Sequence, residues 1–290
     1  MSAPCYYRFD VGRFHCLSLS DGSYEYDPVK IFPGISEEYT RELVKGYPQH
    51  NGMIISPYSF LFVDTGLNKI LCDMGAGSLG PDTGKFIDSL KMGGVMPEEI
   101  DNVIITHAHP DHIGGTLNEK GFPNFPNACY YIWKEEWDFW FSDDSFSSVE
   151  DHYSTILKPE VFMKTARGQL GPVRDRIIFM TKESEILPGV HIHRTPGHTP
   201  GHIAVSFVSE ENELYFVGDA IVFSFLIENP DVIPVFDLIP GEADKTKRDL
   251  CNILSAKRAL VHAQHFSPFP SLGHIIRNGA AFKWEPVDGQ

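Results

Sequence analysis

Short apolar runs alternate with polar turns along this chain, and their spacing predicts both strands and helices. Residues 59–73 consist of two apolar runs around an Asp-Thr-Gly turn, a pattern typical of a β-hairpin. The four-residue spacing of Phe86 and Leu90 predicts a helix over 83–91 that ends near Gly93. Further strands are predicted at 102–106, 128–133, 185–194, 213–217 and 259–263. Further helices are predicted at 134–141 and 245–257, the second with Leu250, Ile253 and Leu254 on one apolar face.

This alternation of elements predicts an α/β fold in which helices cover the sheets. We find no internal repeat and no low-complexity linker, so the simplest organisation is a single domain over residues 1–290. Residues 22–58 hold many aromatics and prolines without clear periodicity. We expect an irregular lead-in there, which offers either a pocket rim or a homodimer contact.

Charge narrows the range of partners. The chain carries 39 acidic and 24 basic residues, a formal net charge of −15. Such a surface repels phosphate backbones and anionic lipid, so we expect no nucleic-acid and no membrane partner. No apolar run approaches the ~18 residues of a membrane span. Residues 1–10 lack the pattern of a signal peptide and the five cysteines are scattered, which favours a cytoplasmic protein with reduced thiols.

The segment 106–112 reads Thr-His-Ala-His-Pro-Asp-His and places three imidazoles and one carboxylate close together. Burying so many polar groups costs free energy unless they bind something, and a metal ion is the natural ligand. In an extended loop His107 and His109 project to the same side, and Asp111 and His112 follow. We expect Pro110 to keep a helix out of this loop.

Three further metal-capable residues each follow a predicted strand. They are His198, Asp219 and His265, with His262 and His274 near enough in sequence to compete with the last. Functional groups often stand at strand ends, where a rigid scaffold presents them at one sheet edge. The alternative is a set of isolated core or surface histidines, which four converging strand ends make improbable.

Five histidines and two aspartates exceed the three or four protein ligands of one catalytic zinc, so two ions are expected. One ion would take His107, His109 and His198. The other would take Asp111, His112 and His265, with Asp219 bridging the pair. Imidazole and carboxylate donors suit zinc and also iron, manganese or cobalt. Water held between two such cations becomes a hydroxide near neutral pH and attacks a carbonyl or phosphoryl centre.

These motifs resemble the metallo-β-lactamase superfamily. The resemblance lies in Thr-His-Ala-His-Pro-Asp-His-Ile-Gly-Gly at 106–115, Thr-Pro-Gly-His-Thr-Pro-Gly-His at 195–202, Gly-Asp-Ala at 218–220 and the late histidine. It implies a four-layer αββα sandwich with a dinuclear centre. By the same resemblance, Asp73 would contact a liganding histidine, and His202 would be structural.

Within the superfamily, residues 265–274 and the aromatic stretch 137–140 are similar to the methyl parathion hydrolase-like and lactonase branch. Val222 stands where two-metal acyl-homoserine lactonases carry a tyrosine, three residues after the bridging aspartate. Trp140 is the aromatic side chain that the resemblance places nearest the pocket. Phe223 and Phe225 would either line the pocket or belong to a buried strand. Residues 228–240 form either a loop over the site or a plain surface connection.

The resulting hypothesis is a dinuclear metal-dependent hydrolase that acts on small-molecule esters, lactones or phosphotriesters. Asp111 would also protonate the departing alkoxide as a general acid. One alternative is a di-iron oxidoreductase or dioxygenase on the same fold, which spectra of the purified protein would reveal. A second alternative is an acyl thioesterase, whose acidic carrier would meet an unfavourable charge on this surface.

Overall fold

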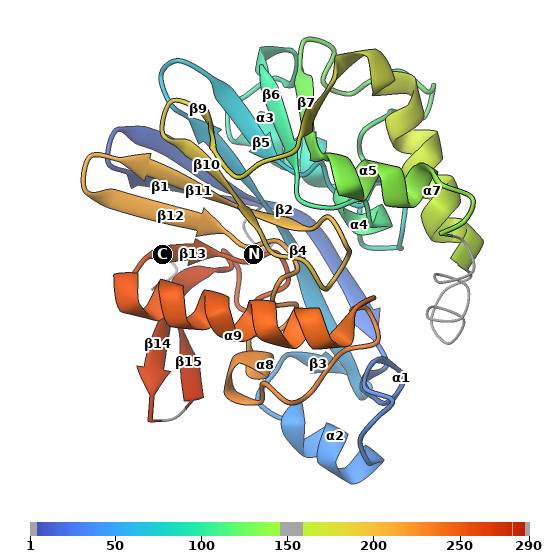
Figure 1. Ribbon diagram of the computed structural model, residues 1–290, viewed down its shortest axis with the longest axis vertical. Helices are drawn as coiled ribbons and strands as arrows, with labels where there is room; N and C mark the ends of the chain where they lie inside the picture. Colours follow the sequence, from blue (N-terminus) through green and yellow to red (C-terminus); the bar gives the residue numbers. More distant parts are fainter. Residues whose placement is uncertain (1–4, 146–158, 280, 288–290) are drawn as a thin grey trace.

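The computed structural model describes residues 5–145, 159–279 and 281–287. Two β-sheets lie face to face, and helices cover the outer face of each sheet (Figure 1). This arrangement confirms the four-layer αββα sandwich implied by the sequence motifs.

The first sheet runs in the order β1-β2-β4-β5-β6-β7-β8, with β3 paired to β4. Its strands are β1 (Tyr6–Val11), β2 (Phe14–Tyr26), β3 (Gln49–His50), β4 (Met53–Asp64), β5 (Lys69–Cys72), β6 (Asn102–Ile105), β7 (Cys129–Trp133) and β8 (Ile177–Met180). The helices in this half are α1 (Pro28–Ile31), α2 (Glu37–Leu43), α3 (Phe86–Met92), α4 (Pro110–Ile113), α5 (Lys134–Phe141) and α7 (Pro159–Leu170). Two 3-10 turns lie at Pro97–Glu99 and Gly171–Arg176.

The second sheet runs in the order β15-β14-β13-β12-β11-β10-β9. Its strands are β9 (Glu185–Leu187), β10 (Val190–Arg194), β11 (Ile203–Ser209), β12 (Asn212–Phe216), β13 (Leu260–His262), β14 (Leu272–Asn278) and β15 (Ala281–Pro286). Its helices are α8 (Phe225–Glu228) and α9 (Pro240–Lys257). Figure 1 shows α9 lying across this half of the molecule.

Side chains that alternate along β4 supply two separate layers of the core. Leu61 and Val63 face the second sheet and share a buried cluster with Phe207 of β11. Phe60 points the other way, and its ring centroid lies 5.3 Å from that of Phe86 in α3. Because successive strand residues point to opposite faces, one strand binds both the opposing sheet and the covering helix.

Most of the predicted elements are present. β4 and β5 form the expected hairpin, α3 ends at Gly93, and α5 covers the predicted 134–141. Two elements differ from expectation. The strand expected within 185–194 is β10, and the additional strand β9 precedes it as a hairpin partner, because Gly189 adopts a φ of +77° and turns the chain between them.

Helix α9 begins at Pro240 rather than at 245, since proline is accommodated in the first turn of a helix. Its residues Leu250 and Leu254 are buried against the second sheet as expected. The expectation for Ile253 was wrong, because its side chain lies at the flank of that face and is 48% exposed.

The expected irregular lead-in at 22–58 was also wrong. Its two ends belong to β2 and β4, which pair from His15 opposite Asp64 to Tyr26 opposite Ile54, and α1, α2 and β3 lie between them. Polar residues hid these strands from pattern analysis, because their side chains are buried but bonded to each other. The hydroxyls of Tyr26 and Tyr58, for example, lie 2.6 Å apart.

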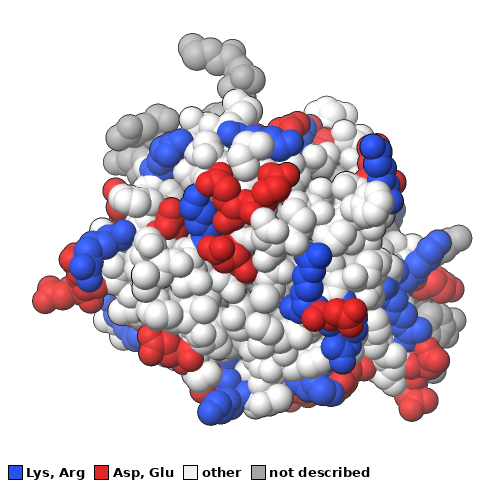
Figure 2. Space-filling view, turned by 90° about the horizontal axis from the view of Figure 1, so that it is seen from above, with Lys and Arg blue, Asp and Glu red and all other residues white. Residues whose placement is uncertain are grey.

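The surface carries charges of both signs. On the face in Figure 2, Lys and Arg side chains lie among Asp and Glu rather than in one continuous basic area. Within the described ranges, no helix has the length and apolarity needed to cross a bilayer. All five cysteines are free, and Cys16, Cys72 and Cys251 are buried.

Candidate metal centre

The first group of candidate ligands follows β6. After Ile105 the chain stays extended through His107 and His109, and then forms the one-turn helix α4. The expectation that Pro110 keeps a helix out of this segment was wrong. Pro110 occupies the first position of α4, where a missing N–H is tolerated, and His109 is its N-cap residue. The turn brings Asp111 and His112 back toward the two preceding histidines.

The second group follows three strands of the other sheet. β10, β12 and β13 run in the same direction, because β11 is antiparallel to its neighbours and β12 pairs parallel with β13. Their carboxyl ends therefore lie at one edge, where His198, Asp219 and His265 follow. The candidate ligands thus come from facing edges of two sheets, rather than from the single edge that the sequence suggested.

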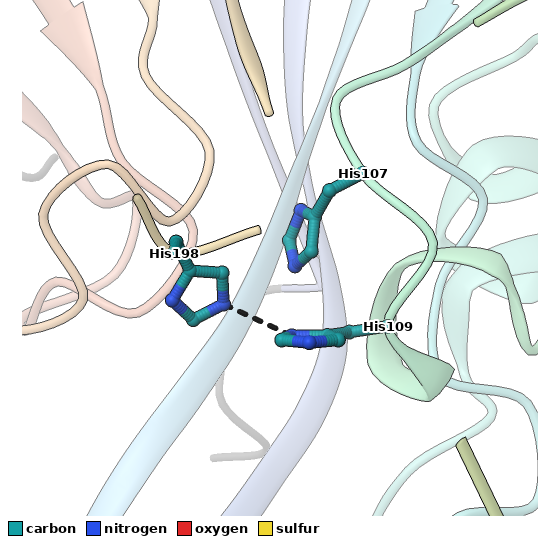
Figure 3. A group of neighbouring side chains, drawn as sticks. All are labelled: His107, His109 and His198. Carbon is teal, nitrogen blue, oxygen red and sulfur yellow. Dashed lines mark hydrogen bonds between the residues drawn. The ribbon is translucent and has the colours of Figure 1, made fainter. Parts of the chain in front are cut away.

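All seven candidate residues meet in two adjoining groups. Within each group, the atoms that could bind a metal lie within 4.8 Å of one another. The first group is His107, His109 and His198. The second group is Asp111, His112, Asp219 and His265. Figure 3 shows the first group, in which His109 and His198 approach from opposite segments with Nδ1 and Nε2 2.9 Å apart.

Asp219 lies between the two groups. Its Oδ2 is 3.3 Å from Nε2 of His198 and 3.3 Å from Nε2 of His265, and its Oδ1 is 3.3 Å from Nε2 of His112. Burial raises the pKa of Asp219, but the neighbouring His265 and His112 outweigh it and hold that pKa well below its ordinary range. An ionised carboxylate in this position can offer one oxygen to each group.

The donor chemistry fits metal ions. His107 Nε2, His112 Nε2 and Asp219 Oδ1 are buried without a hydrogen-bond partner among the described residues. Burial and nearby imidazoles lower the pKa of His107, so its ring is neutral and able to ligate. Unbonded buried polar atoms are costly, and cations remove that cost. Imidazole and carboxylate donors in these numbers suit two divalent ions, zinc foremost.

Three of the candidate ligand rings are held from behind. His112 Nδ1 lies 2.7 Å from Asp73, and His198 Nδ1 lies 2.9 Å from Asp237. His265 Nδ1 lies 3.0 Å from the hydroxyl of Ser56. These contacts leave Nε2 of each ring directed at the centre. The contact expected for Asp73 is confirmed, whereas Asp237 was not singled out from its Pro/Asp-rich segment.

The competing histidines lie elsewhere. His262 is buried, but its Nε2 faces the hydroxyl of Ser18 at 2.9 Å. His274 Nδ1 faces the carbonyl oxygen of Ala259 at 2.9 Å. Of the three late histidines, His265 alone therefore belongs to the donor groups found among the described residues.

With this geometry established, comparison with known proteins gives the family. A model described as the Metallo-beta-lactamase superfamily matches residues 59–265. The chain belongs to this superfamily. The matched range contains all seven donors of the centre.

Individual relatives within the superfamily are distant. An N-acyl homoserine lactonase from Bacillus cereus is 26% identical over 202 residues, which is 70% of this chain and 66% of that protein. The chain spans two thirds or less of the length of the lactonase relatives that it matches.

Two solved structures share the fold over nearly the whole chain. The crystal structure of AbOPH, described as a hydrolase in the beta lactamase superfamily, matches with a TM-score of 0.91, 24% identity and 100% of both chains covered. AidC, described as a dizinc quorum-quenching lactonase in complex with a product, matches with a TM-score of 0.91, 24% identity and 98% of both chains covered.

One histidine of the second motif, His202, has a structural role. His202 Nδ1 lies 2.7 Å from the hydroxyl of Thr195, and its Nε2 accepts a hydrogen bond from the backbone N–H of Asp219 at 3.0 Å. His202 therefore positions the backbone of Asp219 and is not a member of either donor group, which confirms the structural role expected for it.

Glu136 of α5 joins the two ligand-bearing loops. Its Oε1 accepts hydrogen bonds from the backbone N–H of Ala108 at 2.8 Å and from the indole of Trp140 at 2.6 Å. Its Oε2 accepts from the hydroxyl of Thr199 at 2.6 Å and from the N–H of Gly201 at 3.1 Å. Sequence analysis missed this residue, although its helical spacing from Trp140 places it on the buried face.

The centre lies at one end of a cavity of about 250 Å³. His109, Asp111, His198, Asp219 and His265 form its polar end. Its other walls are largely apolar or aromatic, with three charged side chains among them: Tyr24, Glu25, Tyr26, Asp27, Lys30, Ile31, Met53, Leu79, Pro110, Phe162, Val222 and Phe236. Part of the 22–58 segment thus forms a pocket rim, one of the two roles expected for it.

The aromatic residues predicted near the pocket are placed differently. Trp140 is fully buried, and its ring contacts His109 and Phe162 instead of lining the cavity. Phe223 and Phe225 stack on each other with ring centroids 5.2 Å apart, and neither lines the cavity. They do not form a strand either, because α8 begins at Phe225. Residues 228–240 are more than a surface connection, since Phe236 lines the cavity and Asp237 contacts His198.

Proposed function

We propose that this chain is a metal-dependent hydrolase that acts on lactones, with aryl esters and phosphotriesters as further substrates of the same chemistry. One observation carries the proposal. Two adjoining groups of possible metal donors, with Asp219 3.3 Å from a histidine of each, border a cavity with a largely apolar or aromatic lining. The lactonase relative from Bacillus cereus and the dizinc lactonase AidC support the choice of lactones.

The cavity favours a small neutral substrate with an apolar part. Ile31, Met53 and Phe236 provide apolar contact area away from the donors. Lys30 at the rim lies 3.7 Å from Asp27, so much of its charge is already balanced. A carbonyl group would therefore enter the polar end while a hydrocarbon substituent packs along the walls.

The proposed ligand roles are those predicted from sequence: His107, His109 and His198 for one ion, Asp111, His112 and His265 for the other, and Asp219 shared. Two bound divalent cations would polarise the attacked oxygen and supply hydroxide as the nucleophile at neutral pH. The protein must then position those cations and the substrate. Asp73 and Asp237 serve that purpose by orienting His112 and His198.

Asp111 is proposed to have a second task. It borders the cavity, and its Oδ2 lies 3.4 Å from Nε2 of His265. If one carboxylate oxygen of Asp111 held an ion, the other could take up the proton that the hydroxide still carries after its attack and pass it to the departing alkoxide. This transfer matters most for poor leaving groups, whose oxygen is strongly basic.

Metal analysis and a substrate panel on one preparation test the proposal. We expect two divalent ions per chain, and hydrolysis of lactones that is faster than that of aryl esters, thioesters and phosphotriesters. A preparation that holds two ions and turns over none of these compounds would refute the assignment. A coloured iron centre that consumes oxygen would favour the oxidoreductase alternative, and preferred cleavage of thioesters would favour the thioesterase.

In the same assay, Asp111→Asn should slow lactone opening by roughly 10²–10⁴-fold if both ions stay bound. Asp231→Asn is the control, because Asp231 is 93% exposed and pairs with Arg248 far from the donor groups. Unchanged turnover in Asp111→Asn with both ions present would rule out proton transfer by this residue. If Asp111→Asn lost one ion, the result would support a role for Asp111 as a metal ligand and not as a proton carrier.

A further inference from the structure

Two tyrosines meet at the wall of the cavity. Tyr26 ends β2 and Tyr58 lies in the neighbouring strand β4. Their hydroxyl oxygens are 2.6 Å apart, a short and strong hydrogen bond. Tyr26 borders the cavity and is partly exposed to it, whereas Tyr58 is completely buried.

Burial decides which hydroxyl donates in this pair. A buried O–H needs an acceptor, and Tyr26 Oη is the only hydrogen-bond partner of Tyr58 Oη within the described part of the chain. Either hydroxyl of the pair could donate, but the arrangement with Tyr58 as donor and Tyr26 as acceptor is the one that satisfies the buried O–H. That arrangement leaves the proton of Tyr26 free, and Tyr26 borders the cavity.

The surroundings keep the Tyr26 ring in place. Its centroid lies 4.9 Å from that of Tyr24 and 5.3 Å from that of Phe236, both of which also line the cavity. The ring of Tyr58 in turn lies 5.0 Å from the ring of His265, so the tyrosine pair stands next to the donor groups. Burial holds the pKa of Tyr26 well above its ordinary value, and the group therefore stays a proton donor.

We propose that Tyr26 is a substrate-binding residue whose hydroxyl donates a hydrogen bond to an oxygen of the lactone or ester in the cavity. The proposal rests on the proposed function and adds a contact that the metal donors do not provide. Tyr58 acts as a positioning residue, because its own O–H orients the lone pairs and proton of Tyr26. A pocket with such a donor selects against ligands that lack an acceptor at that place.

Phenylalanine variants of Tyr26 and Tyr58, made singly and together, test the roles of the two hydroxyls. Tyr26→Phe should lower kcat/KM for a lactone about tenfold, the effect of losing one neutral hydrogen bond. Tyr58→Phe should lower it only about two- to fivefold, since the Tyr26 hydroxyl is kept but less well oriented. The double variant should be no worse than Tyr26→Phe, because both changes act through one contact.

The direction of the hydrogen bond has its own readout. Tyr26→Phe leaves the buried O–H of Tyr58 without an acceptor and should therefore lower Tm more than Tyr58→Phe does. The double variant should recover part of that loss in Tm. Tyr39→Phe is the control, because Tyr39 is 49% exposed on α2 and lies outside the cavity lining. All variants should retain the same metal content as the unaltered protein.

The outcomes separate this proposal from the function on which it rests. If lactones are hydrolysed but Tyr26→Phe stays within twofold of the unaltered protein, the role of Tyr26 is refuted and the function stands. If nothing is hydrolysed, the function fails, and an open-chain γ-hydroxy acid titrated into metal-loaded protein tests Tyr26 directly. Weaker binding of this acid to Tyr26→Phe supports the contact; equal binding, or no binding to either protein, overturns it.

Discussion

At the scale of single residues, buried polar side chains organise this protein in pairs. Three of the candidate ligand rings, His112, His198 and His265, are oriented by carboxylates or a hydroxyl from other segments. Asp73 and Asp237 each face the rear nitrogen of one histidine. Such supporting contacts keep donor atoms in place before metal arrives, and therefore reduce the entropy lost on binding.

Glu136 provides the sharpest test at this scale. In Glu136→Gln, an NH2 group replaces one of the two acceptor oxygens and faces two donor groups. Each buried donor that loses its acceptor costs about 1–3 kcal/mol of folding free energy. We expect a lower free energy of unfolding and weaker metal binding, because both ligand-bearing loops lose their common anchor. Urea unfolding and titration with zinc measure the two effects.

Glu135→Gln is a matched control one residue away. Glu135 lies on the exposed side of α5 and pairs with Arg194, a contact of the surface type that contributes about 0–1 kcal/mol. If Glu136→Gln bound zinc as tightly as Glu135→Gln, the four hydrogen bonds would be unnecessary for positioning the loops.

At the scale of elements, the short helix α4 is held against the end of β5 by direct backbone contact. The N–H of Met74 donates to the carbonyl oxygen of His112 at 2.8 Å, and the N–H of Gly115 donates to Gly75 at 3.0 Å. A Cβ atom on Gly115 would lie 2.1 Å from the carbonyl oxygen of Met74. Only glycine allows the two segments to approach so closely.

We therefore expect Gly115→Ala to push α4 away from β5 and to misplace Asp111 and His112. The cost should be about 1–3 kcal/mol in the free energy of unfolding, with reduced occupancy of the second ion. Gly46→Ala is the control, because a Cβ atom there meets nothing within 4 Å. Equal stability and equal metal content in the two variants would show that the contact is not restrictive.

At the scale of the whole molecule, the donor groups connect the two halves of the sandwich. Four candidate ligands follow β6 of the first sheet, and three follow strands of the second. Bound cations would therefore hold the two sheet edges together. The organisation as a single domain, predicted from the absence of a linker, agrees with this connection and stays a prediction.

Metal removal should accordingly destabilise the entire fold and not a single loop. Ligands that bind only the folded state add about 4 kcal/mol when present at ~1,000 times their Kd. For a chain of this size that corresponds to a fall in Tm of roughly 5–10 °C on chelation. Calorimetry with chelator, and with the same chelator saturated with zinc, measures it. An unchanged Tm would mean that the centre adds nothing to the joining of the sheets.

The seven donors could be predicted because each stands in a short motif directly after an apolar strand. Local patterns also located the hairpin of β4 and β5, the helices α3 and α5, and the strand β6. The same patterns failed for β2 and for the beginning of β4, where buried serines and tyrosines bond across strands. Periodicity detects apolar burial, and it is blind to polar residues that are buried because a partner satisfies them.

The sequence alone determined the types of donor, their local order and the alternation of strands with covering helices, because strand and helix periods and motif spacing act over a few neighbouring residues. The four-layer arrangement followed from the resemblance of the motifs to the superfamily. Only the tertiary structure decided that His265 and not His262 joins the centre, that Glu136 anchors two loops, and that Tyr26 faces the cavity. Those outcomes depend on strand register and on the packing of one sheet over another. Such long-range geometry brings together residues whose separation along the chain carries no periodic signal.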